Sequence, residues 1–313
     1  MKSAGFIAVL LLTALASFGQ GNQTQAPAQS APPAQNAAPN QAPGAAPAKP
    51  AGRMLQAQSQ EEMKAYQDAF ALTDPDKVEA AATAFAAKYP NSQLRASLYI
   101  RAMNLYAQSN NTDKVIDAGR QAIAADPINP VPLVQVASAL AETTHDTDLD
   151  REQRLAEAAK DAHAAIDNID TGLLVPANAD PARVEGAKRS ILTMAYDTLG
   201  MVDLTKQDYA SAVTNLQKAI SESSGNPEAV LYLRLSVAQD KLKQYPQALD
   251  SANKAVQYAK DGTMAQNLAK QQQARLQKLM SAEPGAGGAA PMSPSPAPTT
   301  PPSTSPAPSN PQH

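Results

Sequence analysis

Asp146, Asp148 and Asp150 alternate along the chain, and Glu157 follows where a calcium-binding loop of the form D-x-D-x-D…E places its bidentate carboxylate. Arg151 stands where such a loop needs glycine for its turn, and the segment after it has the spacing of a helix, which would spread the ligands apart. We therefore interpret the cluster as the acidic start of a helix, where negative charge complements the helix dipole. A calcium site at these four carboxylates is the weaker alternative.

The three histidines do not form a recognisable catalytic group. His313 lies in a Pro-rich tail, His163 lies beside an alanine-rich helix face, and His145 lies in a loop with no Ser–acid pair at recognisable spacing. The sequence has no glycine-rich phosphate loop and no H-E-x-x-H pattern. We expect the protein not to be an enzyme and to need no cofactor.

Charge and cysteine content narrow the classes of ligand. The 313 residues include 26 Lys and Arg against 29 Asp and Glu, interspersed, for a net charge of −3. No basic face is available to neutralise nucleic-acid phosphates. The absence of cysteine excludes disulfides, thiolate metal sites and a lipid-anchor cysteine. Other proteins or peptides are therefore the expected partners.

Residues 1–19 have the composition of a signal peptide. Lys2 supplies the positive start, Gly5 to Leu15 is an apolar run, and small residues offer cleavage sites near Ala16 or Gly19. The run is shorter than the roughly 20 residues that span a membrane, so an uncleaved anchor is the weaker reading. We expect export to the periplasm or the exterior.

Both ends of the remaining chain are of low complexity. Residues 20–57 are rich in Ala, Pro and Gln, and residues 283–313 are rich in Pro, Ser and Thr. Such segments bury too little apolar surface to offset their ordering entropy, and we expect disordered tethers with an extended, polyproline-like C-terminal tail. Spanning an envelope, carrying sugars or presenting Pro-rich ligands to wall or membrane machinery are alternative roles.

The middle, residues 58–282, is composed of good helix formers and lacks the alternation of strands. Residues 209–220 place apolar side chains at i, i+4, i+7 and i+8, and the same pattern returns about 36 residues later in residues 245–256. Each of these helices is preceded by another with its own apolar spacing. Pairs of amphipathic helices recurring at this period predict a helical solenoid.

The motifs in these units resemble those of a known family. Leu199-Gly200, Asp208-Tyr209, Ala212, Leu216 and Lys218-Ala219-Ile220 resemble the tetratricopeptide repeat (TPR) consensus, and residues 99–127 and 232–256 match in the same register. The resemblance implies an all-α fold: a right-handed superhelical solenoid of antiparallel helix pairs, with about five TPR-like repeats and a C-terminal capping helix near residues 263–280.

Two further units match the consensus less well. One spans about residues 61–94, and the other begins near Leu133 and carries an insertion around residues 145–150 that delays its second helix. Asp74-Pro75, Asp180-Pro181 and Asn226-Pro227 each place a capping side chain before a proline, which predicts a helix start.

The resemblance also implies a concave groove, lined by the first helix of each pair, that holds an extended peptide or a partner helix. The positions carried over to this groove are Ile100, Asn104, Gln108, Val134, Ser138, Glu142, Asp197, Met201, Leu233, Val237 and Lys241. Asn104 matches an asparagine of family members that bind a chaperone C-terminus, but Ile100 replaces their lysine. We do not expect a carboxylate clamp.

Three functions follow from this pattern. The first is a non-enzymatic scaffold of the cell envelope or exterior that holds a partner segment in the groove. The second is an envelope assembly or structural accessory tethered through its Pro-rich tails. A role as accessory to a wall-active hydrolase is the remaining, weaker alternative, because the sequence offers no acid/base pair for such chemistry.

Overall fold

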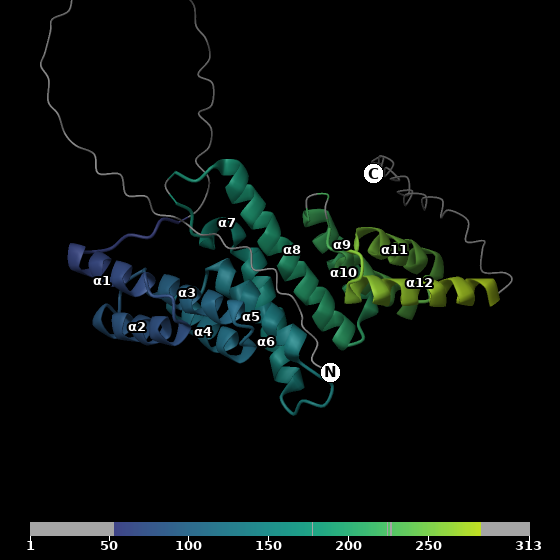
Figure 1. The fold of residues 1–313 in the computed structure, drawn as a ribbon, viewed down its shortest axis with the longest axis horizontal. Helices are drawn as coiled ribbons and strands as arrows, with labels where there is room; N and C mark the ends of the chain where they lie inside the picture. Colours follow the sequence, from purple (N-terminus) through teal and green to yellow (C-terminus); the bar gives the residue numbers. More distant parts are fainter. Residues whose placement is uncertain (1–52, 177, 224, 226, 283–313) are drawn as a thin grey trace, which may run out of the picture.

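The computed structural model describes residues 53–282 except 177, 224 and 226. This part of the chain forms helices (Figure 1), and its only β-pairing is an isolated bridge between Arg53 and Leu174. The helices are α1 (Gln60–Phe70), α2 (Pro75–Lys88), α3 (Arg95–Gln108), α4 (Thr112–Ala125), α5 (Pro130–Thr143), α6 (Arg151–Asp167), α7 (Ile169–Gly172), α8 (Pro181–Thr205), α9 (Tyr209–Glu222), α10 (Ala229–Lys241), α11 (Tyr245–Tyr258) and α12 (Met264–Ala282). The expected signal peptide and C-terminal tail lie outside the described residues.

The helices stack as consecutive antiparallel pairs. α1 packs with α2, α3 with α4, α5 with α6, α8 with α9, and α10 with α11, and α12 covers the last pair. The short α7 leads into α8, which crosses from the first three pairs to the last two (Figure 1). The prediction of an all-α helical repeat fold with a capping helix is confirmed.

Capping side chains start several helices as predicted. The Asp74 carboxylate accepts hydrogen bonds from two backbone N–H groups at the start of α2, and Asp180 accepts one from Ala182 at the start of α8. Asn226 lies outside the described residues, and α10 begins at Ala229 after Glu228, two residues beyond Pro227. Pro227 is buried instead, so it packs in the interior and does not open the helix.

The folded part begins earlier than the predicted boundary at residue 58. Arg53 exchanges backbone hydrogen bonds with the segment after α7, donating to Leu173 O and accepting from Val175 N, each at 2.9 Å. Its guanidinium lies 2.5 Å from the Asp126 carboxylate and 3.1 Å from the Gly172 carbonyl. Composition indicated a linker here because residues 20–57 are rich in Ala, Pro and Gln, but the partners of Arg53 are more than seventy residues away in sequence.

Small residues let successive helices approach closely. The inward face of the second helices is largely alanine, and Ala158, Ala212 and Ala248 have no exposed surface. Gly119 of α4 lies so near α5 that an added Cβ would be 2.2 Å from Val136 Cγ2. The narrow apolar faces seen in the sequence therefore produce close helix packing.

Candidate partner-binding groove

Contacts between helices define the inner side of the solenoid. Along the stack, α1 contacts α3, α5 contacts α8, α8 contacts α10, and α10 contacts α12. Successive second helices, and also α3 with α5, make at most marginal contact with one another. In a curved stack the helices that touch are on the inside of the curve, and those that splay apart are on the outside. These contacts place the first helices from α5 onward on the concave face, as the family resemblance implies.

Two residues predicted for the groove do not reach it. Val134 is 2% exposed and packs in a core cluster with Ile191 and Ala195 of α8. Met201 is 9% exposed and belongs to the core cluster that contains Leu140 of α5. Both residues are buried for the same reason: α8 is 25 residues long and packs against α5 and α6, and this contact buries Val134 on α5 and Met201 on α8 itself.

The other predicted positions retain accessible surface. Gln108, Glu142 and Lys241 are exposed, and Ile100, Asn104, Ser138, Asp197, Leu233 and Val237 are half-buried. The Asn104 Oδ1 atom is buried without a hydrogen-bond partner in the described part of the chain. Binding of a partner by these nine residues stays a prediction.

The middle of the concave face carries a charged cluster from three successive first helices. Ser138 Oγ of α5 donates to Glu142 Oε1 at 3.2 Å, and Arg234 of α10 forms an ion pair with Asp197 of α8. The ion pair is largely buried, with side-chain exposures of 23% for Arg234 and 18% for Asp197. Three ionised side chains thus meet here with a combined charge of −1.

The Glu142 carboxyl combines exposure to solvent with partial loss of its hydration. Burial raises the pKa of the Glu142 carboxyl above its ordinary value, and the nearby Arg234 opposes that rise. Yet Glu142 counts among the exposed residues. The carboxylate is therefore accessible, while the neighbouring helices remove part of its hydration. A partly desolvated carboxylate interacts more strongly with a hydrogen-bond donor than a fully hydrated one.

Comparisons with known proteins add only distant structural likenesses. No family model and no curated protein matches the chain. A MamA protein shares 16% identity over 59% of this chain and 88% of its own, with a TM-score of 0.38. The assembly chaperone of RpL4 (Acl4) shares 11% identity over 71% and 98%, with a TM-score of 0.36. The APC/C hetero-tetramer Cut9–Hcn1 shares 14% identity over 69% and 42%, with a TM-score of 0.33.

Sequence reasoning missed Arg234, although a signal for it exists. Oppositely charged residues one repeat apart lie side by side in four places, with separations of 35 or 37 residues: Glu79 with Lys114, Arg120 with Glu157, Asp197 with Arg234, and Asp240 with Arg275. In a stacked repeat, residues one period apart occupy equivalent places on adjacent units. A search for opposite charges at the repeat period would therefore have found these pairs.

The structure separates the four carboxylates of the calcium alternative. Glu157 receives two hydrogen bonds from the Arg120 guanidinium, at 2.8 and 2.7 Å. Asp148 accepts from the His145 backbone N–H at 2.7 Å, and Asp150 is the residue before α6. Within residues 53–282, as far as described, no group of three or more His, Cys, Asp or Glu side chains is placed to hold a metal ion. The ligands of the proposed calcium site are not brought together.

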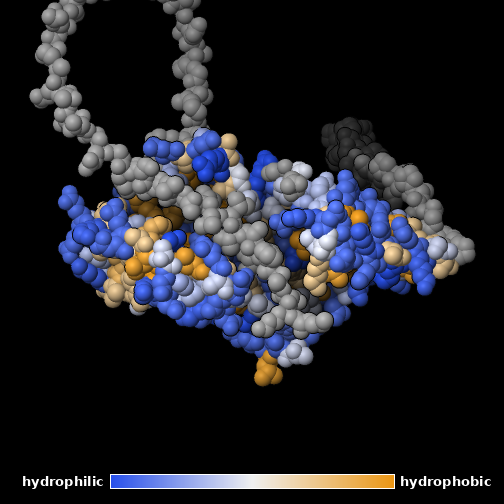
Figure 2. All heavy atoms as spheres, in the orientation of Figure 1, coloured by the Kyte–Doolittle hydropathy of each residue, from blue (hydrophilic) through white to orange (hydrophobic). Residues whose placement is uncertain are grey.

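On the face seen in Figure 2 the surface is mostly hydrophilic, with hydrophobic residues gathered most densely over the end that carries α1 to α4. None of the helices in the described ranges is both long and apolar enough to cross a membrane.

Proposed function

We propose that this protein is a non-enzymatic scaffold that binds a segment of a partner protein in the concave groove formed by α3, α5, α8 and α10. The observation that carries the proposal is the charged cluster of Glu142, Asp197 and Arg234, to which α5, α8 and α10 each contribute one side chain. Half-buried Leu233 and Val237 lie on α10, one of these helices. An apolar surface with a few oriented polar groups suits a segment that offers both side chains and backbone N–H donors.

The location of this scaffold is a second part of the proposal. The Lys2 start and the apolar run after it support export to the periplasm or the exterior. The Pro-rich ends support the other candidate, an envelope assembly accessory in which the tails reach wall or membrane machinery while the solenoid holds its partner. Removal of the tails distinguishes the two, since a scaffold that relies on the groove alone would keep its partners.

The test compares groove variants with matched variants elsewhere. We would immobilise the exported chain with Glu142→Gln and Leu233→Lys, and as control the chain with Glu152→Gln and Leu268→Lys, whose side chains are exposed on α6 and α12. Proteins retained from an envelope extract by the wild type and the control, and lost by the groove variant, are the expected partners.

Titration calorimetry with a purified partner then measures the effect. Loss of a hydrogen bond to a partly desolvated charged group predicts an affinity at least about tenfold weaker for Glu142→Gln. Circular dichroism of each variant checks that the helices are intact. Equal binding by the groove and control variants would show that the partner binds elsewhere.

A further inference from the structure

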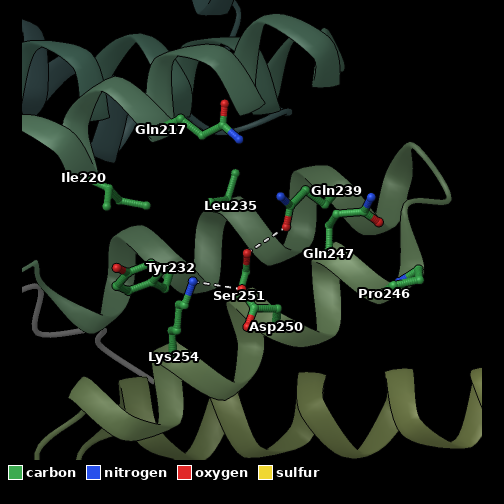
Figure 3. A pocket seen from close by; sticks show the side chains of 10 residues that line it. All are labelled: Gln217, Ile220, Tyr232, Leu235, Gln239, Pro246, Gln247, Asp250, Ser251 and Lys254. Atoms are coloured by element: carbon green, nitrogen blue, oxygen red, sulfur yellow. Dashed lines mark hydrogen bonds and ion pairs between the residues drawn. The ribbon is translucent and has the colours of Figure 1, made fainter. Parts of the chain in front are cut away.

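A hollow lies on the outer side of the solenoid, between α9 and α11, with α10 as its floor (Figure 3). Its volume is about 530 Å³. It exists because successive second helices splay apart, so side chains of α10 become accessible between them. The apolar part of the lining comes from Ile220, Tyr232 and Leu235, and Pro246 lies at its end.

The polar part of this groove is rich in hydrogen-bond donors. Gln239 is 5% exposed, and its Oε1 accepts from Ser251 Oγ at 2.7 Å, which leaves its amide N–H₂ group to donate. Gln217 and Gln247 project from α9 and α11 (Figure 3), and within the described residues their side-chain amides have no hydrogen-bond partner. Three glutamine amides thus surround an apolar floor.

The charges at the groove compensate one another. Lys254 and Asp250, one turn apart on α11, form an ion pair at 2.8 Å (Figure 3). The groove therefore offers neutral amide groups beside apolar surface and no net charge. The complementary occupant is an uncharged segment with apolar side chains and free backbone carbonyl groups.

The chain itself contains such a segment. Residues 284–313 include no Lys, Arg, Asp or Glu and are rich in proline. Proline contributes a C=O acceptor and no N–H donor, and Pro-rich segments adopt polyproline II without internal hydrogen bonds. Grooves lined by aromatic and apolar residues recognise such segments at low entropic cost.

The end of α12 lies close enough to the groove for the following segment to reach it. Leu276 of α12 packs on Ala248 and Ala252 of α11, so α12 runs back toward the start of α11. Ala282 ends α12 six residues later, or roughly 9 Å further along the helix axis. Residues 246 and 247, at the start of α11, form one end of the groove. An extended segment of roughly 3.1 Å per residue therefore reaches the whole groove, at an effective concentration on the order of millimolar.

We propose that residues 284–313 bind in the α9–α11 groove of the same chain. Their proline rings lie on Ile220, Tyr232 and Leu235, and their carbonyl oxygens accept hydrogen bonds from Gln217, Gln239 and Gln247. This site is separate from the concave groove, so the two proposals stand or fall independently.

The experiment uses the full chain with one introduced cysteine, because the native sequence has none. A nitroxide label on Ser303→Cys is expected to broaden the methyl NMR signals of Ile220 and Leu235, and to leave those of Leu140 in the opposite half unchanged. The same label on Ser30→Cys, in the other low-complexity segment, is the matched control. Equal broadening from both labels, or no broadening at Ile220 and Leu235, would overturn the proposal.

Two further measurements test which side chains bind the tail and whether the tail binds within its own chain. Gln217→Glu with Gln247→Glu replaces two donors by acceptors of similar size, and is expected to lower the ratio of bound to free tail by roughly tenfold or more. Gln257→Glu, also exposed on α11 but outside the groove, should have no effect. Mixing a labelled chain with an unlabelled isotope-enriched chain should give no broadening, and broadening there would refute binding within one chain.

Discussion

Replacement of Gly119 by alanine tests the close approach of α4 and α5 that sets the spacing of the solenoid. An added Cβ would lie 2.2 Å from Val136 Cγ2 and 3.1 Å from Met103 Sδ. Both neighbours have no exposed surface, so neither side chain can turn outward. The substitution therefore forces the two helices apart or distorts their side chains.

The expected magnitude follows from two opposing effects. Alanine in place of glycine inside a helix gains about 1 kcal/mol of helix propensity. Overpacking a buried interface costs about 1–3 kcal/mol. Because the contact with Val136 is far inside van der Waals distance, we expect the upper part of that range and a net loss of about 1–2 kcal/mol in the free energy of unfolding.

Gly186 supplies the matched control, since it lies in α8 with nothing within 4 Å of an added Cβ. Gly186→Ala should stabilise the protein by up to about 1 kcal/mol, because only the propensity term acts. Urea denaturation followed by far-UV circular dichroism compares the two variants with the wild type. Equal stabilisation by both substitutions would refute the close approach of α4 and α5.

Three other predictions concern buried or anchoring groups. Burial raises the pKa of Asp161 from 3.8 to about 6, so the native state loses stability as pH rises through 6. Asp161→Asn should therefore add on the order of 2 kcal/mol to the free energy of unfolding at pH 7 and little at pH 4. Denaturation at both pH values measures this effect, with Asp167→Asn as the exposed control. Arg53→Ala should speed hydrogen exchange at the Val175 amide, which donates to Arg53 O, and an unchanged rate would show that the side chain does not hold this segment. Leu276→Ala, at a fully buried position, should destabilise the capping helix by about 2–5 kcal/mol, seen as an early loss of α12 protection in hydrogen exchange.

Much of the fold could be predicted from local signals. The alanine-rich faces, the Asp-Pro caps and the recurrence of helix pairs about 36 residues apart identified the helical repeats and the capping helix. These signals depend on residues close in sequence, where the helix period and the capping geometry act directly. Pro227 misled the prediction because a proline can open a helix or pack in the interior, and only tertiary packing decides which.

The groove could be predicted in outline and not in detail. The repeat register assigned the first helices to the concave face, and Ser138, Glu142 and Asp197 retain accessible surface there. The burial of Val134 and Met201 depends on the length and path of α8, which no local pattern in the sequence specifies.

The sequence by itself determined the helical class, the repeat period, the caps and the uncharged composition of the C-terminal tail, because each depends on residue type and short-range spacing. The tertiary structure alone decided which side chains meet across repeats. Arg234 pairs with Asp197 near Glu142, and Arg53 pairs with Asp126. Arg120 pairs with Glu157, which the sequence had offered as a calcium ligand. Such pairs depend on how far each helix is rotated and translated against the next. That geometry results from the combined packing of all the helices, and only the folded chain displays it.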